Sequence, residues 1–201
     1  MHYKKQKNLF LRQSYQDAWV DYERSLTQAH FIQWDYVILT ASNENQAEVY
    51  RRQIEKRLEK RLLPQKTRYV VLPDPEGKRV GSGGATFQVL RYIAEQEGKN
   101  KQTDCQNRIP SAEESLDPDS AQAGSSTVNP FSHLRILVIH SGGDSKRIPQ
   151  YSACGKLFSP VPRELPDGRG STLFDEFIIG MSTVPSRIAE GMLVLSGDVL
   201  L

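Results

Sequence analysis

Short apolar runs alternate with amphipathic segments along most of this chain. Three runs rich in β-branched residues have the length of strands, at 34–41, 68–73 and 136–139, and a fourth lies at 191–201. Segments with helical periodicity stand between them. Because strands that alternate with helices form parallel sheets, the pattern predicts an α/β fold: a doubly wound, mainly parallel, Rossmann-like sheet with buried strands.

An aromatic stripe marks the N-terminal segment. Tyr15, Trp19 and Tyr22 recur at helical spacing, as the buried face of an amphipathic helix does. We assign residues 1–33 to this helix and residues 34–201 to the domain on which its aromatic face packs.

A second helix is expected directly after the first strand. Ser42 and Asn43 can cap its N-terminus, Pro64 ends it, and Tyr50 belongs to its apolar face. Its basic residues, between 51 and 61, are interleaved with glutamates three or four positions away. We therefore interpret this face as solvated ion pairs and not as an RNA-binding surface.

Two later segments are polar. Residues 98–130 are rich in Ser, Asp, Gln and Asn and almost free of apolar residues, which predicts a flexible insertion between a helix and a strand. Residues 163–170 have the composition of a turn. Ser171 is then expected to cap a helix, and the last strand is expected to be buried.

Composition excludes several classes of function. The 201 residues carry a net charge of only +2, whereas general nucleic-acid or membrane-surface binders are usually strongly basic. No apolar run approaches the roughly 20 residues that cross a bilayer, and no secretory signal is visible. The two cysteines do not have metal-ligand spacing. These features predict a soluble cytoplasmic protein with no nucleic-acid or membrane partner.

A first glycine-rich motif follows the strand at 68–73. Gly81, Ser82, Gly83 and Gly84 precede a helical pattern that starts near residue 87. Backbone N–H groups of such a loop and of a helix N-terminus attract anions. The motif lacks the Gly-Lys-Ser/Thr of a P-loop, so its interpretation is open between a phosphate-binding loop and a tight turn.

A second motif follows the strand at 136–139. Gly142 and Gly143 are succeeded by Ser145, Lys146 and Arg147, which combines close backbone approach with fixed positive charge. This arrangement is suited to a nucleoside triphosphate. Lys156 follows closely.

The last predicted strand ends in Ser-Gly-Asp, with Asp198 as its carboxylate. The carboxyl ends of parallel strands are where open α/β sheets bind ligands. A carboxylate at this edge is a natural ligand for Mg²⁺ when phosphates are nearby.

The order of these motifs resembles the sugar-1-phosphate nucleotidyltransferases. Within them it is most similar to the GDP-fucose pyrophosphorylase domain of bifunctional L-fucokinase/fucose-1-phosphate guanylyltransferases. The resemblance rests on residues 74–86, 140–149, 155–156 and 196–199. Ser145-Lys146 replaces the Gly-Thr of the wider superfamily, and Gly155 replaces the Pro of its Pro-Lys pair. Both departures are those of the fucose-1-phosphate branch.

The resemblance implies transfer of a guanylyl group from GTP to L-fucose 1-phosphate, on a sheet of the nucleotidyltransferase type. Arg147 and Lys156 would be catalytic, Asp198 would hold Mg²⁺, and the remaining motif residues would bind the nucleotide: Gly81, Ser82, Gly83, Gly84, Gly142, Gly143, Ser145 and Lys146. His140 is expected to be a satisfied strand-end residue and not a general base.

Members of this family are several times longer, so the resemblance also implies an N-terminal fragment with an incomplete domain. An alternative function follows: a catalytically incomplete nucleotide-binding fragment of a longer fucokinase/pyrophosphorylase. Fucokinase activity of the chain itself is not expected, because the sugar-kinase motifs of such proteins lie in their C-terminal part.

Overall fold

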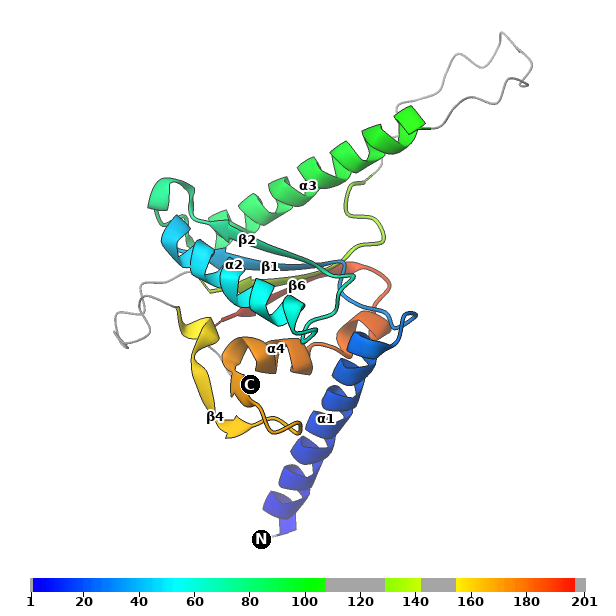
Figure 1. Ribbon diagram of the computed structural model, residues 1–201, viewed down its shortest axis with the longest axis vertical. Coiled ribbons are helices and arrows are strands. Elements are labelled where there is room, and N and C mark those ends of the chain that lie inside the picture. The colour runs from blue at the N-terminus through cyan, green and yellow to red at the C-terminus, as the bar shows by residue number, and fades with distance from the viewer. Residues whose placement is uncertain (1, 108–128, 142–154, 198–201) are drawn as a thin grey trace, which may run out of the picture.

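The computed structural model describes residues 2–107, 129–141 and 155–197, with side chains at 2–8 and 100–107 excepted. Its helices and strands follow the order α1, β1, α2, β2, α3, β3, β4, β5, α4, β6 (Figure 1). The helices are α1 (His2–Thr27), α2 (Glu44–Glu59), α3 (Gly81–Asn107) and α4 (Leu173–Gly180). The strands are β1 (Tyr36–Ala41), β2 (Arg68–Pro73), β3 (Arg135–His140), β4 (Pro160–Glu164), β5 (Gly170–Thr172) and β6 (Gly191–Ser196). No helix among the described residues is long and apolar enough to cross a membrane.

Four parallel strands form the main sheet, in the order β2-β1-β3-β6. Strand β1 is central and all six of its residues are buried, with Ile38 paired to Val70 on one side and to Val138 on the other. Its run of β-branched and apolar residues suits a strand covered on both faces. The predicted positions of the four sheet strands are confirmed.

Helices cover both faces of this sheet (Figure 1). On one face, Val89 and Ile93 of α3 pack on Tyr36, Ile38 and Val138. On the other face, α1, α2 and α4 bury the opposite side chains of the same strands, in a cluster that includes Trp19, Tyr50, Ile54, Phe174 and Phe177. The predicted α/β class, with helices on both sides of a mainly parallel sheet, is confirmed.

The strand order creates a switch point between β1 and β3. The chain leaves β1 toward β2 on one side and later crosses to β3 on the other side. Where successive connections diverge like this, a crevice opens at the carboxyl ends of the two strands, and open α/β sheets bind their ligands there. The segment that follows β3 begins at this crevice.

The N-terminal helix packs as predicted. Trp19 and Tyr22 are buried against the α4 side of the core, and the Ser182 hydroxyl donates a hydrogen bond to the Ala18 carbonyl at 3.0 Å. The Tyr22 hydroxyl donates to the Leu62 carbonyl at 2.7 Å. The C-terminal half of α1 is thus part of the domain core, whereas Leu9, Phe10 and Leu11 in its N-terminal half are exposed.

Several predicted boundaries were wrong. Gly81 begins α3, so the first glycine motif is the first turn of this helix and not a loop before it. Residues 98–107, predicted to be a flexible insertion, continue α3; residues 108–128 lie outside the described part. Phe87 is 75% exposed, because α3 turns Val89 and Ile93 to the sheet instead.

The region before β6 also differs from the prediction. Residues 160–172 form an antiparallel hairpin of β4 and β5, with the polar turn limited to its tip. Thr172, and not Ser171, caps α4, in a capping box with Asp175.

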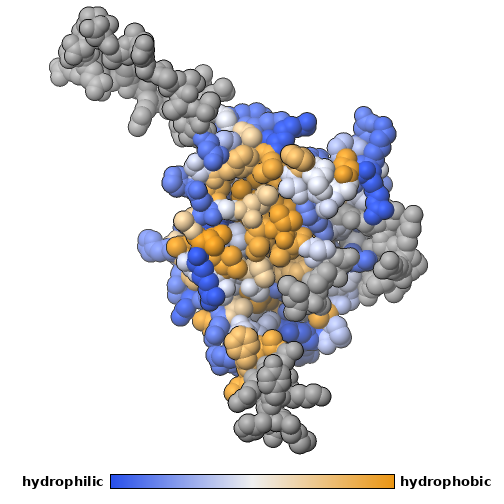
Figure 2. Space-filling model, turned by 180° about the vertical axis from the view of Figure 1, so that it is seen from behind, coloured by the Kyte–Doolittle hydropathy of each residue, from blue (hydrophilic) through white to orange (hydrophobic). Residues whose placement is uncertain are grey.

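Strand β6 was expected to be buried, but it forms an edge of the sheet. Val194 is 43% exposed, and Leu193 and Leu195 are only partly buried. Figure 2 shows a broad apolar area on the face of the molecule turned away from the viewer in Figure 1. In the sheet of the described residues, β6 has a strand neighbour on one side only, so its side chains are less completely covered than those of β1 and β3.

Candidate functional site

His140 lies at the end of β3 and connects three elements of the carboxyl edge. Its Nδ1 lies 3.3 Å from the Thr40 hydroxyl of β1, and its Nε2 lies 3.0 Å from the Thr86 hydroxyl of α3. The Thr86 hydroxyl already donates to the Ser82 carbonyl at 2.9 Å, so Nε2 donates to Thr86 and Nδ1 accepts from Thr40. This network holds the neutral imidazole.

Burial lowers the pKa of His140, although the nearby Asp74 carboxylate acts in the opposite direction. Burial also raises the pKa of Asp74, against the Val80 amide and the Arg79 charge. Asp74 follows β2 directly, and its amide donates to the Ala41 carbonyl of β1 at 2.8 Å. His140 is therefore a satisfied strand-end residue, as the sequence predicted.

The glycine-rich first turn of α3 is presented at the same edge. Gly81, Ser82 and Gly83 are exposed, and Gly81 has a positive φ of 71°. Amide groups in the first turn of a helix have no partner within the helix and form the positive end of its dipole. The Thr86–His140 contact fixes this turn beside the end of β3.

Ser141 starts the connection that leaves β3. Its hydroxyl donates to the Thr40 carbonyl at 2.6 Å, and its amide donates to the Thr40 hydroxyl at 3.3 Å. The Gly197 amide, just past β6, donates to the His140 carbonyl at 2.7 Å. A Cβ on Gly197 would lie 3.0 Å from that carbonyl and from the Ser141 Cβ, so the two strand ends meet closely.

Lys156 opens the short 3-10 turn η3 (Lys156–Phe158), which the core anchors. Leu157 is fully buried, and the Phe158 ring lies 5.2 Å from the Tyr50 ring and 5.0 Å from the Phe174 ring. Gly155 before it has a positive φ of 68°. Lys156 therefore stands on a rigid support next to α2.

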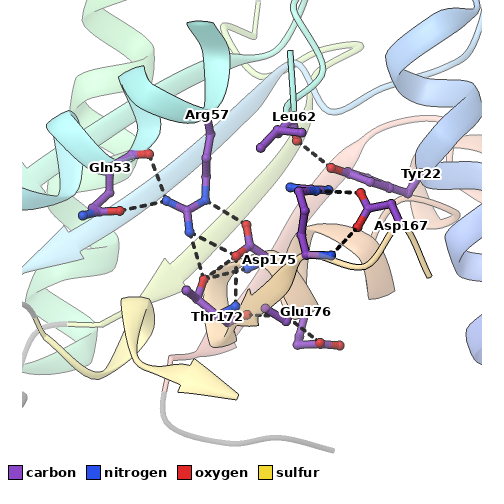
Figure 3. Close-up of polar contacts among 10 residues, drawn as sticks. Tyr22, Gln53, Arg57, Leu62, Asp167, Thr172, Asp175 and Glu176 are labelled. Carbon is purple, nitrogen blue, oxygen red and sulfur yellow. Dashed lines mark hydrogen bonds and ion pairs between the residues drawn. The ribbon is translucent and has the colours of Figure 1, made fainter. Parts of the chain in front are cut away.

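An ion pair beneath this turn joins α2 to the N-terminus of α4 (Figure 3). The Arg57 Nε and Nη2 donate to the two Asp175 carboxylate oxygens at 2.8 and 3.0 Å, and the Arg57 guanidinium lies 5.1 Å from the Phe158 ring centroid. Burial would raise the pKa of Asp175, but hydrogen bonds and charge from Arg57, with help from Thr172, lower it overall.

The burial of this pair corrects the predicted solvation of Arg57, whereas two other basic residues of α2 behave as predicted. Arg57 was assigned to a solvated basic face, but its side chain and that of Asp175 are each only 13% exposed. Two other residues of this face pair as predicted, because Arg51 and Arg52 lie 3.7 and 2.9 Å from the carboxylate oxygens of Glu48.

The structure describes only some of the predicted site residues. The described ones are Gly81, Ser82, Gly83, Gly84 and Lys156, and each lies on a segment in contact with the ends of β1 or β3 or with α2. The others lie outside the described residues: Gly142, Gly143, Ser145, Lys146, Arg147 and Asp198. In the sequence, Gly142 directly follows Ser141 and Asp198 directly follows Gly197. Ser141 and Gly197 are adjacent at this edge. The roles of the predicted residues outside the described part stay predictions.

Sequence reasoning missed the residues that join these segments. They are Thr40 of β1, Thr86 of α3 and Tyr50 of α2. The sequence pattern around each of them predicts a strand or a helix but no role in a site. Their contacts to His140, Ser141 and Gly155 arise from packing between distant parts of the chain. In the described residues, no group of three or more His, Cys, Asp or Glu side chains could hold a metal ion.

Comparison with known proteins bears on this edge directly. Residues 129–201 match the fucose pyrophosphorylase domain family. Over most of its length the chain is also similar in sequence to fucose-1-phosphate guanylyltransferases. A bifunctional fucokinase/GDP-fucose pyrophosphorylase of Arabidopsis thaliana is 32% identical over 174 residues, which are 83% of this chain and 15% of that protein. The resemblance inferred from the motifs is confirmed.

Two further relatives extend the comparison. A fucose-1-phosphate guanylyltransferase of Mus musculus is 31% identical over 168 residues, 82% of this chain and 22% of that protein. An L-fucokinase/L-fucose-1-P guanylyltransferase of Bacteroides fragilis is 29% identical over 97 residues, 48% of this chain and 8% of that protein. The chain thus spans less than a quarter of the length of these relatives. No solved structure matches it.

Proposed function

We propose that this chain forms the nucleotide-binding part of a fucose-1-phosphate guanylyltransferase. The reaction joins the phosphate of L-fucose 1-phosphate to the α-phosphorus of GTP and releases pyrophosphate. The observation that carries the proposal is the carboxyl edge of the sheet. There the first turn of α3, the end of β3 and the end of β6 meet around His140, at the start of the segment that matches the fucose pyrophosphorylase family.

The site favours electrostatic positioning over proton transfer. The attacking phosphate oxygen is already ionised at neutral pH and needs no base. His140 is held neutral with both ring nitrogens engaged by threonine hydroxyls, so it does not serve as one. Catalysis would depend on alignment of the two substrates and neutralisation of their charge.

The predicted residues fit these tasks. The amides of Gly81–Gly84, at the start of α3, would bind phosphate oxygens together with Gly142, Gly143 and Ser145. Arg147 would hold the triphosphate and stabilise the departing pyrophosphate, with Lys146 beside it. Lys156, fixed on η3, would neutralise the phosphate of the incoming sugar.

A magnesium ion is expected to accompany the nucleotide. Mg²⁺ commonly takes one or two carboxylates and completes its shell with water and phosphate oxygens, and Asp198 offers one carboxylate directly after the Gly197–His140 contact. Asp198 would hold the ion, which would neutralise phosphate charge. A cytoplasmic setting with GTP and L-fucose 1-phosphate as small-molecule partners belongs to the same proposal.

The alternative of a catalytically incomplete nucleotide-binding fragment gains no support of its own from the relatives, which are named for complete activities. Release of pyrophosphate by the full-length gene product tests the proposal. GTP with fucose 1-phosphate should release it, and exchange of GTP for ATP or of fucose 1-phosphate for mannose 1-phosphate should reduce the rate. Equal rates for GTP and ATP with either sugar phosphate would refute the stated specificity. No pyrophosphate release with any of these four substrate pairs would refute the reaction.

A further inference from the structure

The hydroxyl of Tyr50 touches both ends of the segment that leaves β3. It donates a long hydrogen bond, 3.4 Å, to the carbonyl of Ser141, the first residue after β3. The backbone of Gly155, fourteen positions later, packs against the same hydroxyl. One side chain of α2 thus joins the point where the segment starts to the point where it ends.

The position of this hydroxyl is fixed by the core. Tyr50 is completely buried, and its ring packs on Phe158 at 5.2 Å between centroids. Helix α2 is itself held by the Asn43 cap at its N-terminus and by the Arg57–Asp175 ion pair near its C-terminus. A rigid helix therefore presents the hydroxyl at one place.

Gly155 has no side chain that would clash with this hydroxyl. A Cβ built on Gly155 would lie 2.0 Å from the Tyr50 oxygen and 2.7 Å from the ring carbon that carries it. Its φ of 68° also disfavours any residue with a side chain. Glycine here permits the backbone to approach the hydroxyl, and Lys156 follows immediately.

We propose that Tyr50 is a positioning residue that holds the Lys156 end of this segment against the Ser141 end. The inference rests on the proposed function, because that function requires Lys156 and the residues after Ser141 to act on the same substrates. Fixing both ends on one hydroxyl sets their separation before any ligand binds, which reduces the cost of ordering them.

A core tyrosine with no such role would behave differently. Tyr22 offers the matched comparison: it is also buried, and its hydroxyl also donates to a backbone carbonyl, that of Leu62, at 2.7 Å. Loss of either hydroxyl removes a partly buried hydrogen bond to a backbone carbonyl. Only loss of the Tyr50 hydroxyl should loosen the Gly155–Lys156 end.

Hydrogen–deuterium exchange on the full chain tests this without a ligand. In Tyr50→Phe, the amides of residues 155–158 should exchange roughly three to five times faster, the range expected for one weak buried hydrogen bond. Tyr22→Phe should leave those amides unchanged. Unchanged protection of 155–158 in Tyr50→Phe overturns the proposal, and so does a uniform increase over the whole chain.

A double-mutant cycle gives an independent readout. Gly155→Ala places a methyl group on the Tyr50 hydroxyl, and Tyr50→Phe removes that closest contact but leaves the 2.7 Å approach to the ring. Exchange at 156–158 in the double variant should therefore be slower than in Gly155→Ala alone. Strictly additive effects would contradict the contact between the two residues.

Titration with GTP and Mg²⁺ separates this proposal from the proposed function. Tyr50→Phe should weaken GTP binding at least threefold and Tyr22→Phe should not, because only the first releases the Ser141 end, which the predicted nucleotide-binding residues Gly142 and Gly143 follow directly. If the unmodified chain binds no GTP, the proposed function fails while the exchange data still decide the role of Tyr50. If GTP binds equally to all three chains, the positioning role is refuted and the function stands.

Discussion

Replacement of Arg57 by methionine should cost this fold a large part of its stability. Arg57 makes two charge-assisted hydrogen bonds to Asp175 (Figure 3). Its guanidinium lies over the rings of Phe158 and Phe174, and its side chain is only 13% exposed. Methionine keeps the apolar stem and removes the charge. Asp175 is then left as a buried carboxylate without a cation.

The expected loss is about 3 kcal/mol, at the lower end of the range for breaking a buried ion pair, because Thr172 still donates to Asp175. Arg52→Met is the control: its pair with Glu48 is on the same helix but is 70% and 48% exposed, so its removal should cost less than about 0.5 kcal/mol. Urea unfolding at pH 7 measures both, and an unchanged slope confirms that the same surface unfolds.

Two further results check the cause. Asp175→Asn in the Arg57→Met background should recover part of the loss, because it removes the unpaired charge. The pKa of Asp175 is lowered in the fold, so the stability due to its charge is present above the unfolded value near 3.9 and is lost as the pH falls below it. The stabilities of the unmodified chain and of Arg57→Met should therefore converge as the pH falls through the lowered, folded-state pKa of Asp175. A loss at pH 7 no larger than that of Arg52→Met would refute the reasoning.

Three other predictions concern the carboxyl edge. Burial lowers the pKa of His140, so its contribution to stability is complete above about pH 6.5 and declines as the pH falls further; unfolding at pH 7.5 and 5.5 should show a smaller pH-dependent loss in His140→Gln, and an equal loss would exclude His140 as its source. Gly197→Ala forces apart the ends of β3 and β6 and should lower stability by about 1–3 kcal/mol, whereas Gly180→Ala, which meets no atom within 4 Å, should not; thermal unfolding compares them. In the full-length enzyme, Arg147→Ala or Asp198→Ala should lower kcat/KM by an amount that corresponds to ~2 kcal/mol or more of transition-state stabilisation. Near-normal turnover would exclude that residue from the site.

The sequence pattern predicts the sheet well because its strands are continuous β-branched runs that suit burial on both faces. It fails for β6 because a strand's burial depends on whether another element covers it. It fails at Gly81–Gly84 because glycines disfavour a helix interior, yet the first turn tolerates them where its amides need no partner within the helix.

For the candidate site, the motif order indicates which segments belong to the edge of the sheet. The contacts that join them do not follow from any local pattern. The burial of Arg57 depends on the cap of a helix more than a hundred residues away, and the role of Tyr50 depends on a glycine equally distant. Such pairs are set by tertiary packing, which periodicity cannot reveal.

The central claim is most directly tested by incubating the full-length gene product with [α-³²P]GTP, L-fucose 1-phosphate and Mg²⁺ and identifying the nucleotide that carries the label. The account predicts that label appears in GDP-L-fucose, that its formation requires fucose 1-phosphate, and that Arg147→Ala suppresses it. Label that remains in GTP, or that moves only to free GDP or GMP whether or not fucose 1-phosphate is present, would contradict it.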